Sequence, residues 1–157
     1  MPTLTFRPLD EAEFETMRTN LITDFSTNKV ASGEWESHGA LERARAQISV
    51  LLPLGRKTPN NYFIGGITTQ GLLIGTVWVC LDEPVPGTAY IYDIVIFPES
   101  RGNGFGRELL SAAEHKAQQH GMKLMELNVF GSNTVARSLY SSHGYETTSL
   151  HMQKGLG

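Results

Sequence analysis

Cysteine, long apolar runs and a surplus of positive charge are all scarce or missing in this chain of 157 residues. The single cysteine, Cys80, excludes an internal disulfide and a zinc site built from several cysteines. No apolar run reaches the ~18 residues that a membrane-spanning helix needs, and the first residues lack the charged-then-apolar pattern of a signal peptide. We therefore expect a cytoplasmic protein.

The charge and the histidine spacing indicate which classes of ligand or partner this chain can bind. The net charge of −3 disfavours nucleic acid, because phosphate binding requires a surplus of Lys and Arg. Residues 1–42 contain eight acids and three cations, a net charge of −5, so the remaining residues carry +2. This asymmetry fits either a solvated acidic helix face or a surface for a cationic partner. The five histidines show no ligand spacing such as H-E-x-x-H, so no metal site is expected.

The order of the predicted elements indicates one mixed α/β layered domain. The first helix begins after Asp10, which forms a capping-box pattern with Glu13, and it breaks at Ser32. Three further helices are expected at Trp35–Leu52, Phe105–His120 and Asn133–His143. Strands are expected at Thr3–Pro8, Tyr62–Thr68, Leu72–Leu81, Ala89–Phe97, Leu124–Phe130 and Thr147–Gln153.

A strand, a glycine-rich loop and a helix start follow one another over residues 94–107. Glycines at 102, 104 and 106 remove side chains, so backbone N–H groups can point at one anion, and the helix N-terminus adds its positive dipole end. Arg101 and Arg107 add positive charge. The spacing is neither G-x-G-x-x-G nor a P-loop. The loop therefore predicts a diphosphate-sized anion site, or else a turn that serves geometry alone.

A second segment places Asn133 and Tyr140 on one face of a helix. They are seven residues apart, which is two turns or about 10.5 Å along the axis. Asn133 suits a helix N-cap. The Tyr140 phenol, with a reference pKa near 10, can hold a proton until a thiolate or alkoxide needs it. The alternative is that Tyr140 is an ordinary core tyrosine of an amphipathic helix.

Together the two segments resemble the GNAT superfamily of acetyl-CoA-dependent N-acetyltransferases. Arg101–Gly106 is similar to its R/Q-x-x-G-x-G/A pyrophosphate motif, and Asn133–Tyr145 is similar to its N-x-x-A-x-x-L-Y-x-x-x-G-F/Y segment. The resemblance covers roughly Tyr90–Lys154. It implies a single α/β (mixed α+β) domain over residues 1–157, with splayed strands in a mixed, mostly antiparallel sheet flanked by helices. Residues 1–60 would then supply acceptor-side helices, and residues 88–145 the acetyl-CoA-binding core.

The resemblance also implies individual roles. Ile94 and Ile96, with Val95 between them, correspond to the strand that pairs with the pantetheine arm, and a bulge is expected near Tyr92–Asp93. Asn133 corresponds to a ligand of the pantetheine or nearby phosphate region. Tyr140 corresponds to the general acid that protonates the departing CoA thiolate. The pyrophosphate loop corresponds to Arg101, Gly102, Asn103, Gly104, Phe105, Gly106 and Arg107.

The sequence departs from the family pattern at the general base. Many relatives place a glutamate on one of the splayed strands, where this chain has Tyr90 and Asn128. An amine must lose a proton before attack, so the base could be Asp93, Glu126, or a water held by Tyr90, Tyr92 and Asn128. A mechanism without a dedicated base is also open, since orientation supplies much of the rate.

The implied function is transfer of an acetyl group from acetyl-CoA to a primary amine of a small molecule or peptide by direct attack. The acidic N-terminal segment favours a cationic acceptor, with Glu34 and Glu36 as candidates beside Trp35, which could equally be a packing anchor. The alternatives are a non-catalytic acyl-CoA-binding or sensing module and a transferase for another acyl group. An edge strand at Thr147–Gln153 could pair two copies into a homodimer.

Overall fold

Five strands form one sheet and follow the order of the sequence across it. The computed structural model describes residues 4–157, so Thr3, the expected start of the first strand, lies outside the described residues. Strands β1 to β4 are antiparallel to their neighbours, and β5 is parallel to β4, as the mixed, mostly antiparallel prediction requires. The strands are β1 (Thr5–Pro8), β2 (Asn61–Ile67), β3 (Leu73–Leu81), β4 (Thr88–Ile96) and β5 (Leu124–Leu127).

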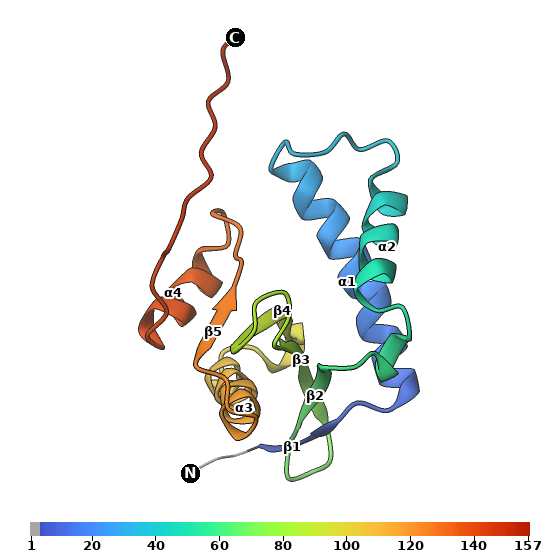
Figure 1. Cartoon of the computed structure of the whole chain (residues 1–157), viewed down its shortest axis with the longest axis vertical. Helices are drawn as coiled ribbons and strands as arrows, with labels where there is room; N and C mark the ends of the chain where they lie inside the picture. Colours follow the sequence, from blue (N-terminus) through green and yellow to red (C-terminus); the bar gives the residue numbers. More distant parts are fainter. Residues whose placement is uncertain (1–3) are drawn as a thin grey trace.

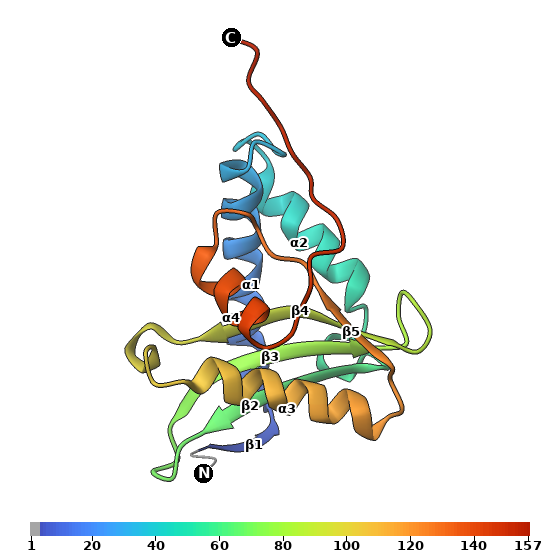
Figure 2. The same cartoon turned by 90° about the vertical axis from the view of Figure 1, so that its left-hand side faces the viewer.

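Helices cover both faces of this sheet (Figures 1 and 2). Helices α1 (Glu11–Ala31) and α2 (Ala40–Leu51) pack on one face, and α3 (Phe105–Gln119) and α4 (Thr134–Ser142) lie on the other. Strand β3 is buried on both sides because Trp78 enters the α1–α2 core while Val77 and Val79 enter the α3 core. No helix within residues 4–157 combines the length and apolar character that crossing a membrane requires.

The start of α1 follows the sequence prediction closely. The Asp10 side chain accepts the N–H of Glu13 at 2.8 Å, and the Glu13 carboxylate accepts the N–H of Asp10 at 2.9 Å. Arg7 in β1 donates to the same carboxylate at 2.7 and 2.9 Å. These bonds lower the pKa of Glu13 to about 2, with the Arg7 hydrogen bond as the largest cause. The capping box is therefore confirmed, and it also ties α1 to the edge of the sheet.

Three sequence predictions were wrong in extent. Helix α2 begins at Ala40 instead of Trp35, because Gly39 has a left-handed φ of 78° that no α-helix contains. Strand β5 ends at Leu127 and does not reach Phe130, since β4 turns away from it there. Thr147–Gln153 forms no strand, because its backbone makes no hydrogen bond to a strand within residues 4–157.

A β-bulge in β4 sets the position of everything downstream. Trp78 pairs with Asp93 while its neighbour Val79 pairs with Ile91. Tyr92 is therefore an extra residue that has no cross-strand partner on β3. The expected bulge near Tyr92–Asp93 is thereby confirmed. Because of the extra residue, Ile91 and Ile94 both contact the α3-side core although they are three residues apart.

We predict that Gly75→Ala in β3 destabilises the protein by about 1–3 kcal/mol. A Cβ at Gly75 would overlap the backbone carbonyl oxygen of Val95 and lie 2.9 Å from Ile96 Cδ1, and a strand backbone cannot yield as a side chain can. Urea denaturation measures the free energy of unfolding. Gly131→Ala is the matched control, because its Cβ would meet nothing within 4 Å, and it should change stability by less than about 0.5 kcal/mol. Equal stabilities would contradict the prediction.

Candidate active site

The divergence of β4 from β5 opens a slot at the edge of the sheet. The two strands pair only from Thr88 to Ile91, and within the described residues β4 has no partner on that side beyond the bulge. The Phe97 N–H donates to the Ile74 carbonyl at 2.9 Å, which points it towards β3. Successive peptide groups of a strand alternate sides, so the polar backbone groups of Ile94 and Ile96 face the slot. The slot therefore offers an unpaired strand edge to a ligand.

The glycine loop lies at the end of this strand, where it turns into α3. Gly102 and Gly104 have left-handed φ values of 82° and 77°, and Gly104 is the N-cap of the helix. Among residues 4–157, no acceptor receives the N–H groups of Gly102 through Arg107. Helices α1 and α4 differ in this respect, because Asp10 and Asn133 cap them with side chains. Six consecutive free N–H groups at a helix N-terminus are suited to bind a phosphate group.

The polar side chains of the loop bind mainly the protein itself. Arg101 Nε donates to the Ile96 carbonyl at 2.9 Å, and Asn103 Nδ2 donates to the Ser100 carbonyl at 3.0 Å. Arg107 Nη2 donates to Ser142 Oγ at the end of α4, at 2.7 Å. These three bonds hold the loop in shape and leave its backbone N–H groups available for an anion.

Helix α4 brings Tyr140 close to the loop. A Cβ at Gly106 would lie 3.2 Å from Leu139 Cδ2, which is a tight contact, so the missing side chain favours this close approach of α3 and α4. Asn133 Oδ1 accepts the Ala136 N–H at 3.2 Å, which confirms its expected N-cap role. Burial, and secondly the charge of Asp93, raises the pKa of Tyr140 to about 12. Tyr140 is therefore a protonated phenol at neutral pH.

Asp93 is a buried acid that directly follows the bulge in β4. Its burial, followed by the like charge of Asp24 on α1, raises its pKa from 3.8 to about 7. A carboxyl group with this pKa is a mixture of its two protonation states at neutral pH. Its charge also acts on Tyr140, so the two groups lie close enough to influence each other. A poised acid–base group next to a protonated phenol is typical of a catalytic site.

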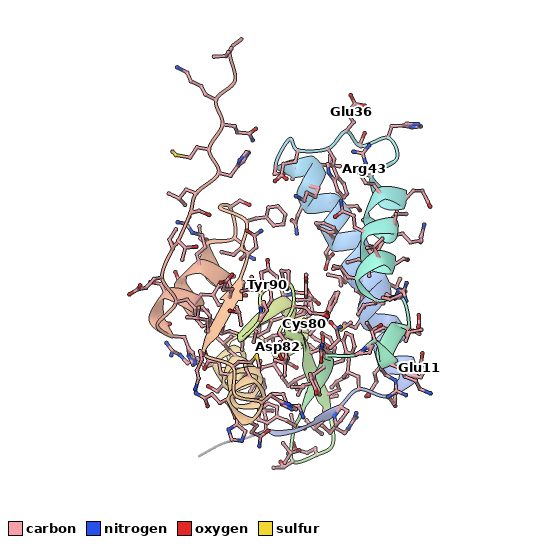
Figure 3. All side chains as sticks on the ribbon, in the orientation of Figure 1. Glu11, Glu36, Arg43, Cys80, Asp82 and Tyr90 are labelled. Carbon is pink, nitrogen blue, oxygen red and sulfur yellow. The ribbon has the colours of Figure 1, made fainter. Side chains whose placement is uncertain are left out.

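An aromatic row lines the α1–α2 side of the slot. Tyr90 and Tyr92 have ring centroids 4.6 Å apart, and Tyr92 stacks on Trp78 at 4.6 Å. Figure 3 shows Tyr90 on the side of the sheet that faces the space between the helix pair and β5. Glu126 is opposite Tyr90 in the β4–β5 register, and with Asn128 it shares the exposed face of this segment, as strand alternation predicts.

Other residues from the sequence analysis lie apart from the slot. Trp35 packs against Phe25 at 5.4 Å between ring centroids and lies under the Arg43 guanidinium at 5.3 Å, so it is a packing anchor. Glu34 pairs with Lys29 at 2.5 Å, and Figure 3 shows Glu36 at the far tip of the helix pair. Cys80 is buried, which raises its pKa to about 11 and rules against a nucleophilic thiolate.

Two features of the site were not predicted from the sequence. Asp24 acts on Asp93 although 69 positions separate them, and no local pattern marks such a pair. Glu114 on α3 accepts the Tyr145 hydroxyl at 2.8 Å and lies 3.1 Å from His143 Nε2. This cluster fixes the end of α4, and so the position of Tyr140, against α3.

A groove elsewhere on the molecule lies outside this slot. It has a volume of about 760 Å³ and runs between α3 and strands β1 and β2, with Phe6, Tyr62 and Lys116 among its lining residues. It shares Arg107 with the glycine loop but includes neither Asp93 nor Tyr140. The chemistry of the groups, and not the size of the cavity, therefore locates the candidate site.

Comparison with known proteins points to one family. The sequence pattern of the Acetyltransferase (GNAT) family matches residues 20–145. The chain is 30% identical over 153 residues to the uncharacterized N-acetyltransferase YdgE of Bacillus subtilis, covering 97% of this chain and 98% of YdgE. The crystal structure of the putative acetyltransferase YycN from Bacillus subtilis matches with a TM-score of 0.91 at 28% identity, covering 98% of this chain and 99% of YycN. The aminoglycoside N-acetyltransferase AAC(6')-Iy, in complex with CoA, shares the fold at 16% identity with a TM-score of 0.64, covering 97% of this chain and 93% of that one.

We predict that Asp93→Asn stabilises the protein more as the pH rises from 4 to 7. The native state holds a proton on Asp93 up to pH about 7, whereas the unfolded chain releases it near 3.8, so the unmodified protein loses stability over this interval. The asparagine variant lacks this loss. Thermal unfolding of both proteins between pH 4 and 8 measures the difference. Glu15→Gln, which removes an exposed carboxylate from α1, controls for the change in net charge. A difference between Asp93→Asn and the unmodified protein that stays constant with pH would contradict the prediction.

Proposed function

Because the chain belongs to the acetyltransferase (GNAT) family, we propose that it transfers an acetyl group from acetyl-CoA to a primary amine by direct attack. Membership of the family establishes the acyltransferase class, and the proposal of acetyl-CoA as donor and a primary amine as acceptor rests on the geometry of the site. One observation carries it: six consecutive backbone N–H groups, from Gly102 to Arg107, have no acceptor among the described residues at the end of an unpaired strand edge. A diphosphate followed by an amide-containing chain fits this sequence of donors.

In this proposal the backbone binds most of the co-substrate. The N–H groups of Gly102, Gly104 and Gly106, with those of Asn103, Phe105 and Arg107, hold the diphosphate. The strand edge from Ile94 to Ile96, including Val95, pairs with the amide groups of pantetheine in the manner of an added strand. Arg101 adds positive charge beside the loop, and Asn133 at the start of α4 lies on the helix face that also carries Tyr140.

Two side chains carry the proton transfers. Asp93 accepts the proton that the acceptor amine must lose before attack, and a pKa of about 7 leaves it partly ionised at neutral pH. Tyr140 gives its proton to the departing CoA thiolate, and its raised pKa ensures that it still holds that proton. The N–H of Ile94 polarises the thioester carbonyl. Asn128, exposed at the far side of the slot, positions the amine or a water next to it.

The acceptor side of the slot favours a cationic amine. Asp24, Asp93 and Glu126 act on the groups around the slot, and Tyr90 and Tyr92 line it with aromatic rings. Carboxylates attract an ammonium group electrostatically, and aromatic faces bind it by cation–π contact. The hypothesis that Glu34 selects the acceptor is weakened, because Lys29 already neutralises that carboxylate.

We predict that acetyl-CoA and CoA bind with micromolar affinity and that pantetheine, which lacks the diphosphate, binds roughly 100-fold more weakly. Loss of two charge-assisted hydrogen bonds at about 1.5 kcal/mol each gives this ratio. Isothermal calorimetry measures the three affinities. Equal affinities would show that the glycine loop is only a turn, and no binding at all would overturn the transferase proposal.

The control for this experiment is Tyr140→Phe, which keeps the ring and removes the acid. It should bind acetyl-CoA as the unmodified protein does, while thiol release with an accepted amine falls by about 100-fold or more. Tyr62→Phe removes a hydroxyl from β2 outside the slot and should preserve both binding and turnover. Equal turnover in Tyr140→Phe would remove Tyr140 from the mechanism.

We predict that kcat/KM rises with pH and bends at about pH 7, where Asp93 loses its proton. Below that pH the carboxyl group is protonated and cannot accept a proton from the amine. Asp93→Asn should lose this bend and turn over at least about 100-fold more slowly, with an unchanged dissociation constant for acetyl-CoA. A variant that keeps the bend would assign the base to Glu126 or to water.

A further inference from the structure

The last eleven residues, 147–157, form an extended C-terminal arm that leaves the body of the protein. Figures 1 and 2 both show this arm rising from α4 and ending beyond the rest of the molecule. No backbone–backbone hydrogen bond of residues 4–157 involves the arm. Within the same residues, one side-chain bond attaches it, from Gln153 Nε2 to the Ser32 carbonyl at 2.6 Å.

This attachment is too weak to hold the arm in an extended form. Fixing the backbone of eleven residues costs far more conformational entropy than one exposed hydrogen bond can offset. The arm also exposes large apolar side chains. Four of the five most exposed large hydrophobic residues in the described chain lie in α4 or the arm: Val135 (82%), Leu150 (72%), Met152 (84%) and Leu156 (93%). Within a single chain these side chains remain exposed.

The sheet provides such a surface at its β5 edge. Strand β5 ends the strand order, and within residues 4–157 no strand pairs with its outer side. Leu124 on β5 is 62% exposed, and Glu126 is exposed as well. An open edge presents a row of N–H and C=O groups to which another extended chain can add.

The arm has the residue pattern of a strand that would fit this edge. Thr148, Leu150 and Met152 alternate with polar residues, which places all three on one face of an extended chain. The arm carries Lys154 and no acid, while β5 carries Glu126 and no base. Eleven extended residues span about 36 Å, so the arm exceeds the length of the four-residue β5 and can continue over neighbouring surface.

We propose that two copies of this chain exchange arms, each adding residues 147–157 as a new strand at the β5 edge of the other copy. The exchange would pair the backbone groups of the arm with those of the β5 edge in both copies. The two copies would be related by a twofold axis, so assembly stops at a dimer. It also accounts for the strand pattern of Thr147–Gln153, which forms no strand within a single chain. This dimer does not depend on the proposed acetyl transfer.

Light scattering coupled to size exclusion tests the assembly. The whole chain should have twice its mass of 17.3 kDa, and a chain ending at Glu146 should have the monomer mass. Leu150→Asp with Met152→Asp should also be monomeric while keeping the circular dichroism of the fold. Val50→Asp is the matched control, because Val50 on α2 is 79% exposed and undergoes the same change, and it should stay dimeric. A monomeric whole chain, or a dimer that survives loss of the arm, would overturn the proposal.

Cross-linking distinguishes exchange from folding back of the arm. Chains carrying only Leu124→Cys and differently tagged chains carrying only Met152→Cys are co-expressed and treated with a short bismaleimide. A covalent heterodimer is expected, because the arm of one copy lies along β5 of the other. The unmodified chain is the control, since its single Cys80 is buried and unreactive. Absence of the heterodimer, with efficient linkage inside a single Leu124→Cys/Met152→Cys chain, would show that each arm folds back on its own sheet.

Discussion

The extra residue at Tyr92 in β4 is the constraint on which the rest of this structure depends. It shifts the strand by one position against β3, so Ile94 packs into the α3-side core and Asp93 pairs with Trp78. Beyond the bulge β4 no longer follows β5, and the two strands separate. The separation creates an unpaired strand edge that leads directly to the glycine loop. A regular β4 would pair along its length and close the slot.

The site retains groups that are unfavourable for stability. Asp93 is buried near the like charge of Asp24, and the N-terminus of α3 has six N–H groups without an acceptor in the described chain. The same protein caps α1 with a complete capping box, so side-chain capping is available to this sequence. Local rules of stability are broken where a ligand or a proton would be bound, which is the expected place for such exceptions.

Much of the fold could be predicted from local pattern, because the decisive signals are local. The Asp10–Glu13 capping box, the nearly continuous apolar run of β3 and the glycines around α3 act within a few residues of each other. Long-range effects could not be predicted in the same way. Asp24 reaches Asp93 only through the packing of α1 on the sheet, and the early end of β5 follows from the path of β4. Thr147–Gln153 has the alternation of a strand but forms none, because a strand also needs a neighbour, which local sequence does not specify.

The slot and the C-terminal arm have the same structural origin. Because β4 leaves β5 after four residue pairs, β5 is short and α4 contains no buried residue. The part of the molecule that would hold acetyl-CoA is therefore the part with the least core of its own. Closing the slot would bury this region and remove the binding site, whereas covering the outer side of β5 would stabilise it and leave the slot open. A strand added from outside meets both requirements, and the exchanged arm of a second copy is a segment of this chain with the length and pattern to supply it.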